Sequence, residues 1–171
     1  CAAIEASNRH TIMLDCGYSF RTGFRPARYL LNHHCRQIDY LIVPAYTEEH
    51  LAGFSDLNNH FLERYFSIDY LISNPSINVN SIHELAIRNP GIGQDLKLLS
   101  KVGYGRKKID RTIQWENASL SFFWNSHPNF LDLYNLSLVT FLSYQDIHII
   151  FPSDLKTEGW RSLLKNPQFC D

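Results

Sequence analysis

One stretch decides the fold: residues 38–51 read Ile-Asp-Tyr-Leu-Ile-Val-Pro-Ala-Tyr-Thr-Glu-Glu-His-Leu. Its first part, Asp39–Val43, is a nearly continuous apolar run, which is the pattern of a strand buried on both faces. The loop 44–49 follows, and apolar residues at helical spacing then predict a helix from about His50 to Tyr65. A buried strand that leads through a loop into a helix indicates a sheet covered by helices.

The sequence on either side of this stretch continues the alternation of strands and helices. Before it, strands are predicted at Ala2–Ala6 and Thr11–Asp15, and a helix at Pro26–Asn32 because proline suits a first helical position. After it, Tyr70–Ser73 is predicted to be a strand. Ser81-Ile82-His83-Glu84 fits a capping box that opens a short helix, which Asn89–Gly93 breaks.

The second half of the chain is richer in strands. Four successive strands are predicted there, at Thr112–Trp115, Ser119–Trp124, Ser137–Tyr144 and His148–Phe151. Asp154 is predicted to cap a closing helix, Leu155–Lys165, whose inner side carries Leu155, Trp160, Leu163 and Leu164. Without repeats or linkers, residues 1–171 are predicted to form one α+β domain.

Composition excludes several classes of protein. Sixteen basic and seventeen acidic residues leave a net charge of −1, so no global basic field points to nucleic acid. The apolar runs are far shorter than the roughly 20 residues of a membrane helix, and no signal peptide is evident. Four cysteines without a CxxC pair predict reduced, mostly buried thiols. A cytoplasmic location without membrane association is expected.

Three places could carry chemistry. Glu48, Glu49 and His50 offer carboxylates and an imidazole at the end of a buried strand, a set able to hold a divalent metal. In the alternative, both acids simply lie near the N-terminus of the following helix, whose dipole favours them. His127, in Ser-His-Pro, is either a ligand or general base or an exposed loop histidine. Asp154 is either a helix cap or a carboxylate on the same strand-end surface.

The order of these motifs resembles the metallo-β-lactamase-fold hydrolases. In that family a strand ends in Asp-Cys/Thr-Gly, as at residues 15–17, and a buried strand then leads into the loop His-x-His-x-Asp-His, matched by residues 45–50. The second half is similar to the branch that includes the hydrolase domain of the DNA-uptake (competence) channel. That branch has a His-Pro, an Asn-x-Ser-apolar strand and a Gly-Asp, matched at residues 127–128, 135–138 and 153–154.

This resemblance implies an αββα metallo-β-lactamase-like sandwich that lacks its C-terminal part. It also implies a metal-dependent ancestry with phosphodiester or other ester substrates. Asp15 would brace the site loop by hydrogen bonds. If the last strand is absent, one sheet should present an open edge, and association with a protein partner or with itself is expected.

The departures from the family motif concern the metal ligands. Ala45 and Thr47 replace the first two histidines and Glu49 replaces the aspartate, whereas His50 is retained. The first metal site would keep only His127. The second would use Glu49, His50 and Asp154, with its fourth ligand beyond the end of this sequence. Ser153 replaces the glycine before Asp154, which crowds the turn if its φ is positive.

These departures predict a degenerate domain that is catalytically inactive and acts by binding. No tightly bound cofactor is expected, with zinc or manganese confined to a partial site. The alternative is a mononuclear metal-dependent hydrolase with Glu49 and His50 as catalytic residues and metal ligands drawn from Glu49, His50, His127 and Asp154.

Two clusters that mix aromatic and basic residues raise nucleic-acid binding as a third hypothesis. Solvated faces explain both clusters equally well, and a steep salt dependence of binding would distinguish the two interpretations. The clusters are Arg21, Arg25 and Arg28 with Phe20 and Phe24, and Tyr104 with Arg106, Lys107 and Lys108.

Overall fold

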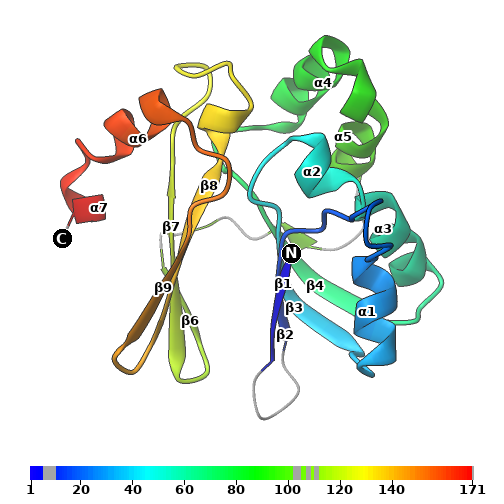
Figure 1. Ribbon diagram of the computed structural model, residues 1–171. Coiled ribbons are helices and arrows are strands. Elements are labelled where there is room, and N and C mark those ends of the chain that lie inside the picture. The colour runs from blue at the N-terminus through cyan, green and yellow to red at the C-terminus, as the bar shows by residue number, and fades with distance from the viewer. Residues whose placement is uncertain (6–10, 102–104, 107–108, 110–111, 171) are drawn as a thin grey trace. The chain divides into compact units, whose positions relative to one another are not determined.

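The computed structural model describes residues 1–5, 11–101, 105–106, 109 and 112–170. The chain divides into two compact units (Figure 1). The first unit comprises Cys1–Val43, Thr47–Ile72 and Asn78–Lys107, and the second comprises Pro44–Tyr46, Ser73–Ile77 and Lys108–Asp171.

The first unit is built on a five-stranded sheet with the strand order β1-β2-β3-β4-β5. Strand β1 is antiparallel to β2, and the remaining neighbours are parallel. Parallel neighbours need a crossover connection, and helices supply each one here. The strands are β1 (Ala2–Glu5), β2 (Thr11–Leu14), β3 (Gln37–Ile42), β4 (Ser67–Ile72) and β5 (Gly105–Arg106).

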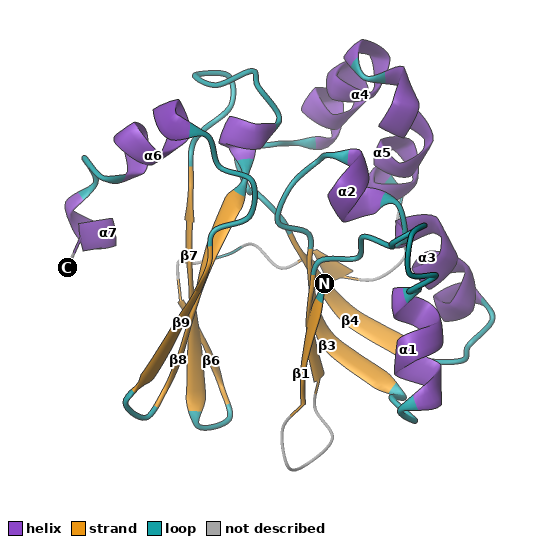
Figure 2. Ribbon diagram, in the orientation of Figure 1, coloured by secondary structure: helices purple, strands orange, loops and turns teal. Residues whose placement is uncertain are grey.

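Helices connect the parallel strands of this sheet, and α1 and α3 lie side by side on one of its faces (Figure 2). Helix α1 joins β2 to β3, α2 and α3 join β3 to β4, and the remaining three elements join β4 to β5. The helices are α1 (Pro26–Asn32), α2 (Glu48–Leu51), α3 (Phe54–Leu62), α4 (Val79–Arg88), the 3-10 helix η1 (Pro90–Ile92) and α5 (Gly93–Ser100).

The prediction of one helix from His50 to Tyr65 was wrong, because the segment forms two helices separated at Ala52 and Gly53. A Cβ on Gly53 would lie 2.3 Å from the carbonyl oxygen of Cys16, so the chain bends where it packs directly against another backbone segment. The second helix ends before Tyr65 because Arg64 adopts φ 61°.

The predicted capping box at Ser81 was also wrong. Helix α4 begins earlier, and its N-cap is Asn78, whose side-chain oxygen accepts a hydrogen bond from the Ser81 amide at 3.0 Å. Ser81 itself lies inside the helix and is buried. The break at Asn89 is confirmed, but the chain turns helical again from Pro90, and α5 was not predicted.

The second unit contains a four-stranded antiparallel sheet in which sequence neighbours pair, β6-β7-β8-β9. All four predicted strands are present, with ends shifted by no more than a residue. They are β6 (Thr112–Trp115), β7 (Ala118–Trp124), β8 (Leu138–Tyr144) and β9 (Ile147–Phe151). The unit also contains the 3-10 helix η2 (Tyr134–Leu136), α6 (Thr157–Leu163) and α7 (Pro167–Cys170).

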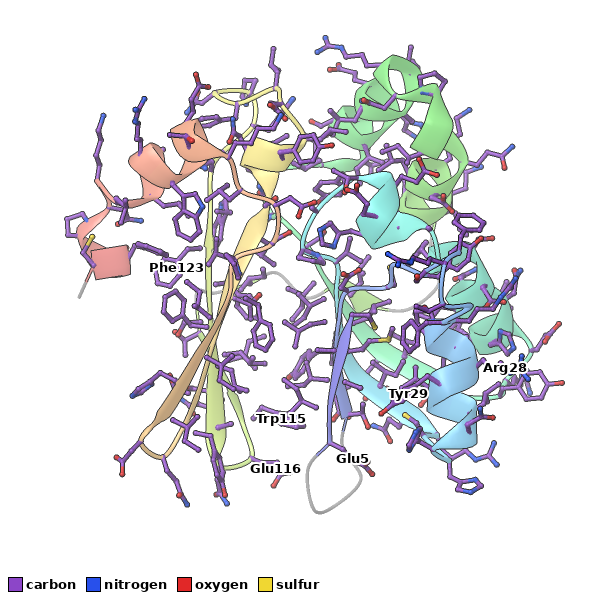
Figure 3. All side chains as sticks on the ribbon, in the orientation of Figure 1. Glu5, Arg28, Tyr29, Trp115, Glu116 and Phe123 are labelled. Atoms are coloured by element: carbon purple, nitrogen blue, oxygen red, sulfur yellow. The ribbon has the colours of Figure 1, made fainter. Side chains whose placement is uncertain are left out.

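An aromatic cluster packs α6 and α7 against one face of this sheet. Val139, Leu155 and Leu163 are buried at its centre. Phe123 of β7 points toward α7 (Figure 3), and its ring lies 5.0 Å from that of Phe169 in an edge-to-face arrangement, which is favourable for aromatic pairs. The cluster also includes Phe141 and Trp160.

The closing helix differs from its prediction. It begins at Thr157 with Lys156 at the N-cap, so Asp154 does not cap it. Leu164 is 59% exposed rather than on the inner side. The hydrophobic surface of this region is instead completed by Phe169, which lies beyond the predicted helix.

The mixed α/β class and the presence of two sheets are confirmed. Among the described strands, β9 is an edge, and three of its apolar side chains are exposed: Ile147 at 58%, Ile149 at 42% and Ile150 at 43%. Within the described part of the chain, no helix has the length and apolar character needed to cross a bilayer. The cysteines form no described disulfide, and only Cys16 is buried, which corrects the expectation of mostly buried thiols.

Candidate functional site

The loop after β3 provides fewer metal donors than the family motif requires. Ala45 is fully buried and has no donor atom. Thr47 is the N-cap residue of α2, but its side chain makes no capping hydrogen bond, and its hydroxyl is buried without a hydrogen-bond partner among the described residues. Of the two positions where the family has its first histidines, neither supplies an imidazole.

Glu48 and Glu49 lie in the first turn of α2, and both are exposed. Carboxylates are stabilised at this position because the unpaired N–H groups of a helix N-terminus carry partial positive charge. The position of Glu48 and Glu49 at a helix N-terminus therefore explains both acids without a metal ion.

His50 is held by Asp15, which lies just after β2 in the same unit. The distance from His50 Nδ1 to Asp15 Oδ2 is 2.9 Å, and the two side chains are only 12% and 16% exposed. The other carboxylate oxygen, Asp15 Oδ1, accepts a hydrogen bond from the Gly17 amide at 2.7 Å. Asp15 adopts φ 73°, which turns the chain so that both contacts can form. This geometry is that of a brace between the end of β2 and the loop.

The backbone beside His50 is fixed by two further contacts from the same segment. The Cys16 thiol donates a hydrogen bond to the carbonyl oxygen of His50 at 3.0 Å. Burial, together with the negative charges of Asp15 and Asp95, raises the pKa of this thiol well above its usual range, so Cys16 remains a neutral donor. Gly17 lies directly against the carbonyl group of Glu49, with no room for a side chain.

The pKa of Asp15 is lowered in the folded protein. Burial alone would raise it, but the hydrogen bond and charge of His50 and the Gly17 amide together outweigh burial. A carboxyl group with a depressed folded pKa stabilises the fold above its unfolded pKa of about 3.9, and this contribution is lost as the pH falls through the lower folded value.

We therefore expect Asp15→Asn to lower the free energy of unfolding at pH 7 by about 1–3 kcal/mol, because the variant loses the charged partner of His50. The difference from wild type should shrink as the pH falls below about 4, where the wild-type Asp15 carboxylate takes up a proton. Urea unfolding at a series of pH values measures it. Glu49→Gln, at an exposed position, is the control and should show little effect, and a pH-independent deficit in Asp15→Asn would contradict the assignment.

His127 and Asp154 belong to the second unit, in loops that follow β7 and β9. The His127 amide donates a hydrogen bond to the Ser76 hydroxyl at 3.0 Å, and the peptide bond between His127 and Pro128 is cis. Ser153, immediately before Asp154, has φ 55°. The turn thus has the positive φ for which the family's glycine is suited, and the expected crowding by a serine side chain applies.

Three buried asparagines, which the sequence analysis missed, organise the loops around His127. Asn74 donates to the carbonyl oxygens of Asn125 and Leu136, both at 2.9 Å. Asn125 in turn donates to the carbonyl oxygens of Asn135 at 3.1 Å and of Gly159 at 3.2 Å. The Asn135 side chain accepts from the Gly159 amide at 3.1 Å. Side-chain amides thereby replace the regular hydrogen bonds that loops lack.

The predicted site residues are thus divided between the units. Glu49 and His50 lie in the first unit, and His127 and Asp154 lie in the second. Within the described residues, no group of three or more His, Cys, Asp or Glu side chains is arranged to hold a metal ion. The assignment of these four residues as ligands remains a prediction.

The first basic and aromatic cluster lies on the surface of the first unit. Arg21, Arg25 and Arg28 are exposed, and Phe20 is 77% exposed. The Arg25 guanidinium lies 5.6 Å from the centre of the Tyr18 ring. Figure 3 shows Arg28 and Tyr29 leaving α1 in different directions. In the second cluster, Tyr104, Lys107 and Lys108 fall outside the described residues. Nucleic-acid binding stays a prediction.

Comparison with solved structures gives a distant structural likeness. No family model matches the chain, and no curated protein matches its sequence. Among solved structures, the metallo-beta-lactamase fold protein YhfI from Bacillus subtilis is similar with a TM-score of 0.46 and 15% sequence identity. The likeness covers 86% of this chain and 52% of that one, so the chain spans about half the length of the structure that it matches.

Proposed function

We propose that the chain is a metallo-β-lactamase-like αββα domain that has lost two-metal hydrolysis and acts by binding. The observation that carries this proposal is the loop after β3, where buried Ala45 and Thr47 stand at the positions of two ligand histidines. Zinc sites use three or four protein ligands, and this loop retains a single imidazole, that of His50. The ancestry itself rests on the order and spacing of the sequence motifs.

Binding through a sheet edge is the activity that suits such a domain. Strand β9 consists of Ile-His-Ile-Ile-Phe and carries no charged side chain that would discourage pairing with another strand. Its exposed isoleucines support association with a protein partner or with a second copy of the chain.

One observation favours a second candidate, a mononuclear metal-dependent hydrolase. A metal-ligating histidine commonly has its other ring nitrogen held by a carboxylate, which orients the ring, and Asp15 contacts His50 in this way. In this alternative Glu49, His50 and Asp154 would hold one metal ion, which would activate water for attack on an ester.

Metal content and hydrolysis decide between the candidates. The protein is expressed in medium with added zinc or manganese and then purified. We expect elemental analysis to find well under one metal ion per chain. We also expect the protein to leave bis(4-nitrophenyl) phosphate unhydrolysed. The combined variant Ala45→His, Thr47→His and Glu49→Asp should take up more zinc, because it rebuilds three ligands on one loop. Thr22→His adds a histidine to another exposed loop and should not.

Two metal contents would contradict the proposal. Two metals per wild-type chain, lost in His50→Ala, would overturn the proposal. One metal per chain, lost in both His50→Ala and Asp154→Ala together with ester hydrolysis, would establish the mononuclear hydrolase instead.

A further inference from the structure

The first unit contains a surface hollow of about 640 Å³ where strands β3 and β4 begin. Volumes of about 300–1,000 Å³ are typical of pockets for small molecules. Arg36, which precedes β3, lines one part of the hollow, and Phe61, Leu62, Arg64 and Tyr65 line another. This hollow is formed by residues outside the loop that carries Glu49 and His50.

Both the backbone and the side chain of Arg36 form hydrogen bonds. Its carbonyl oxygen accepts a hydrogen bond from the Ser67 amide at 2.9 Å, which extends the pairing of β3 with β4. Its guanidinium donates from Nη1 to the carbonyl oxygen of Tyr65 at 3.3 Å. A guanidinium has several N–H donors, so the remaining ones can bind an acceptor in the hollow.

Arg64 occupies a position where glycine is usual. Helix α3 ends in a Schellman motif, in which the Arg64 amide donates to the Phe61 carbonyl oxygen and the Tyr65 amide to that of His60, both at 3.0 Å. Arg64 is the residue with positive φ, 61°, in this motif. A non-glycine residue is strained in this conformation, which fixes where the Arg64 side chain leaves the backbone.

The hollow combines positive charge with exposed apolar surface. No acidic side chain lines it, and within the described part of the chain neither Arg36 nor Arg64 forms an ion pair. Tyr65 is 49% exposed and Leu62 is 65% exposed. Two guanidiniums match the charge of a phosphate monoester, which is about −1.5 to −2 at neutral pH, and a half-exposed tyrosine ring can stack on an aromatic group.

We propose that this hollow binds an aromatic phosphate monoester, the chemistry shared by a nucleoside monophosphate and a phenyl phosphate. Arg36 and Arg64 bind the phosphate, and Tyr65 and Leu62 contact the ring. The proposal does not depend on the loss of metal chemistry, because nucleotide binding and metal content are measured separately.

Isothermal titration calorimetry of the full chain tests the proposal with AMP, phenyl phosphate, adenosine and inorganic phosphate. We expect AMP or phenyl phosphate to bind with a dissociation constant below about 1 mM. Adenosine and inorganic phosphate should each bind at least about tenfold more weakly, because each supplies only one of the two contacts. The tighter binder of AMP and phenyl phosphate identifies whether the hollow fits a nucleoside monophosphate or a phenyl phosphate better.

Two glycine variants distinguish the loss of the Arg64 side chain from the relief of backbone strain at a helix end. Helix α1 ends in the same motif, with His34 at φ 58° as the strained residue, and His34 does not line the hollow. Arg64→Gly and His34→Gly should both fold at least as stably as wild type. Arg64→Gly should weaken AMP binding by about tenfold or more, whereas His34→Gly should leave it unchanged.

Three results would overturn the proposal. They are no detectable binding of either aromatic ester, equal affinity for AMP and inorganic phosphate, and unchanged AMP affinity in Arg64→Gly.

Discussion

Replacement of Gly17 by alanine is expected to prevent stable folding or to lower the free energy of unfolding by more than about 3 kcal/mol. A Cβ on Gly17 would lie 1.7 Å from the carbonyl oxygen and 2.9 Å from the carbonyl carbon of Glu49. Both are backbone atoms, which cannot rotate away as a side chain can. Movement of Gly17 itself is opposed by the hydrogen bond from its amide to Asp15.

Thermal and urea unfolding followed by circular dichroism measure this effect. Gly91→Ala is the matched control, since a Cβ there meets nothing within 4 Å, and its stability should stay within about 0.5 kcal/mol of wild type. A Gly17→Ala protein that melts at the wild-type temperature would show that the segments carrying Gly17 and Glu49 do not approach as closely as described.

Asn74→Asp is expected to have the second largest effect, a loss of about 3–5 kcal/mol at neutral pH. Asn74 is 1% exposed, and its amide nitrogen donates to two carbonyl oxygens. Its side-chain oxygen accepts from the amide and the hydroxyl of Ser76 at 3.0 and 2.7 Å. Aspartate has the same shape but lacks the amide hydrogens, so a buried charge would face two acceptors.

The pH dependence of this variant has a definite sign. Because the folded environment disfavours the charged carboxylate, the folded pKa of the new Asp side chain should exceed its unfolded value of about 3.9, and the deficit should shrink as the pH falls. Asn89→Asp is the control, because Asn89 is partly exposed and donates to only one carbonyl oxygen, that of Leu85. Equal stability of the two variants at pH 7 would refute the role given to Asn74.

Much of the fold follows from local sequence patterns. Helix α1 has its predicted bounds because Pro26 sets its start, and the four strands of the second unit lie within a residue of their predicted bounds. The break at Gly53 could not be predicted, since it depends on contact with Cys16, which is distant in sequence. At α4 the capping-box pattern placed the cap at Ser81, whereas the structure places it at Asn78, a residue type that caps helices equally well.

The candidate site was less predictable than the fold. His50 was singled out by its position after a buried strand, but its partner Asp15 could be anticipated only from the family resemblance. The buried asparagines carry no spacing pattern, because each binds backbone atoms of a different loop. Arg64 resembles an ordinary surface residue in the sequence, and its strain arises from the hydrogen bonds that end α3.

Strand β9 offers a way to follow assembly without any substitution. Among the described strands it pairs only with β8, so part of its row of backbone amides is left for solvent. Those amides should exchange hydrogen for deuterium almost as fast as in an unfolded peptide, whereas amides within β8 are slow. Any molecule that adds a strand to this edge would slow the exchange. Deuterium uptake by a peptide spanning Ile147–Phe151 is therefore a direct measure of how much of this edge is occupied in a given sample.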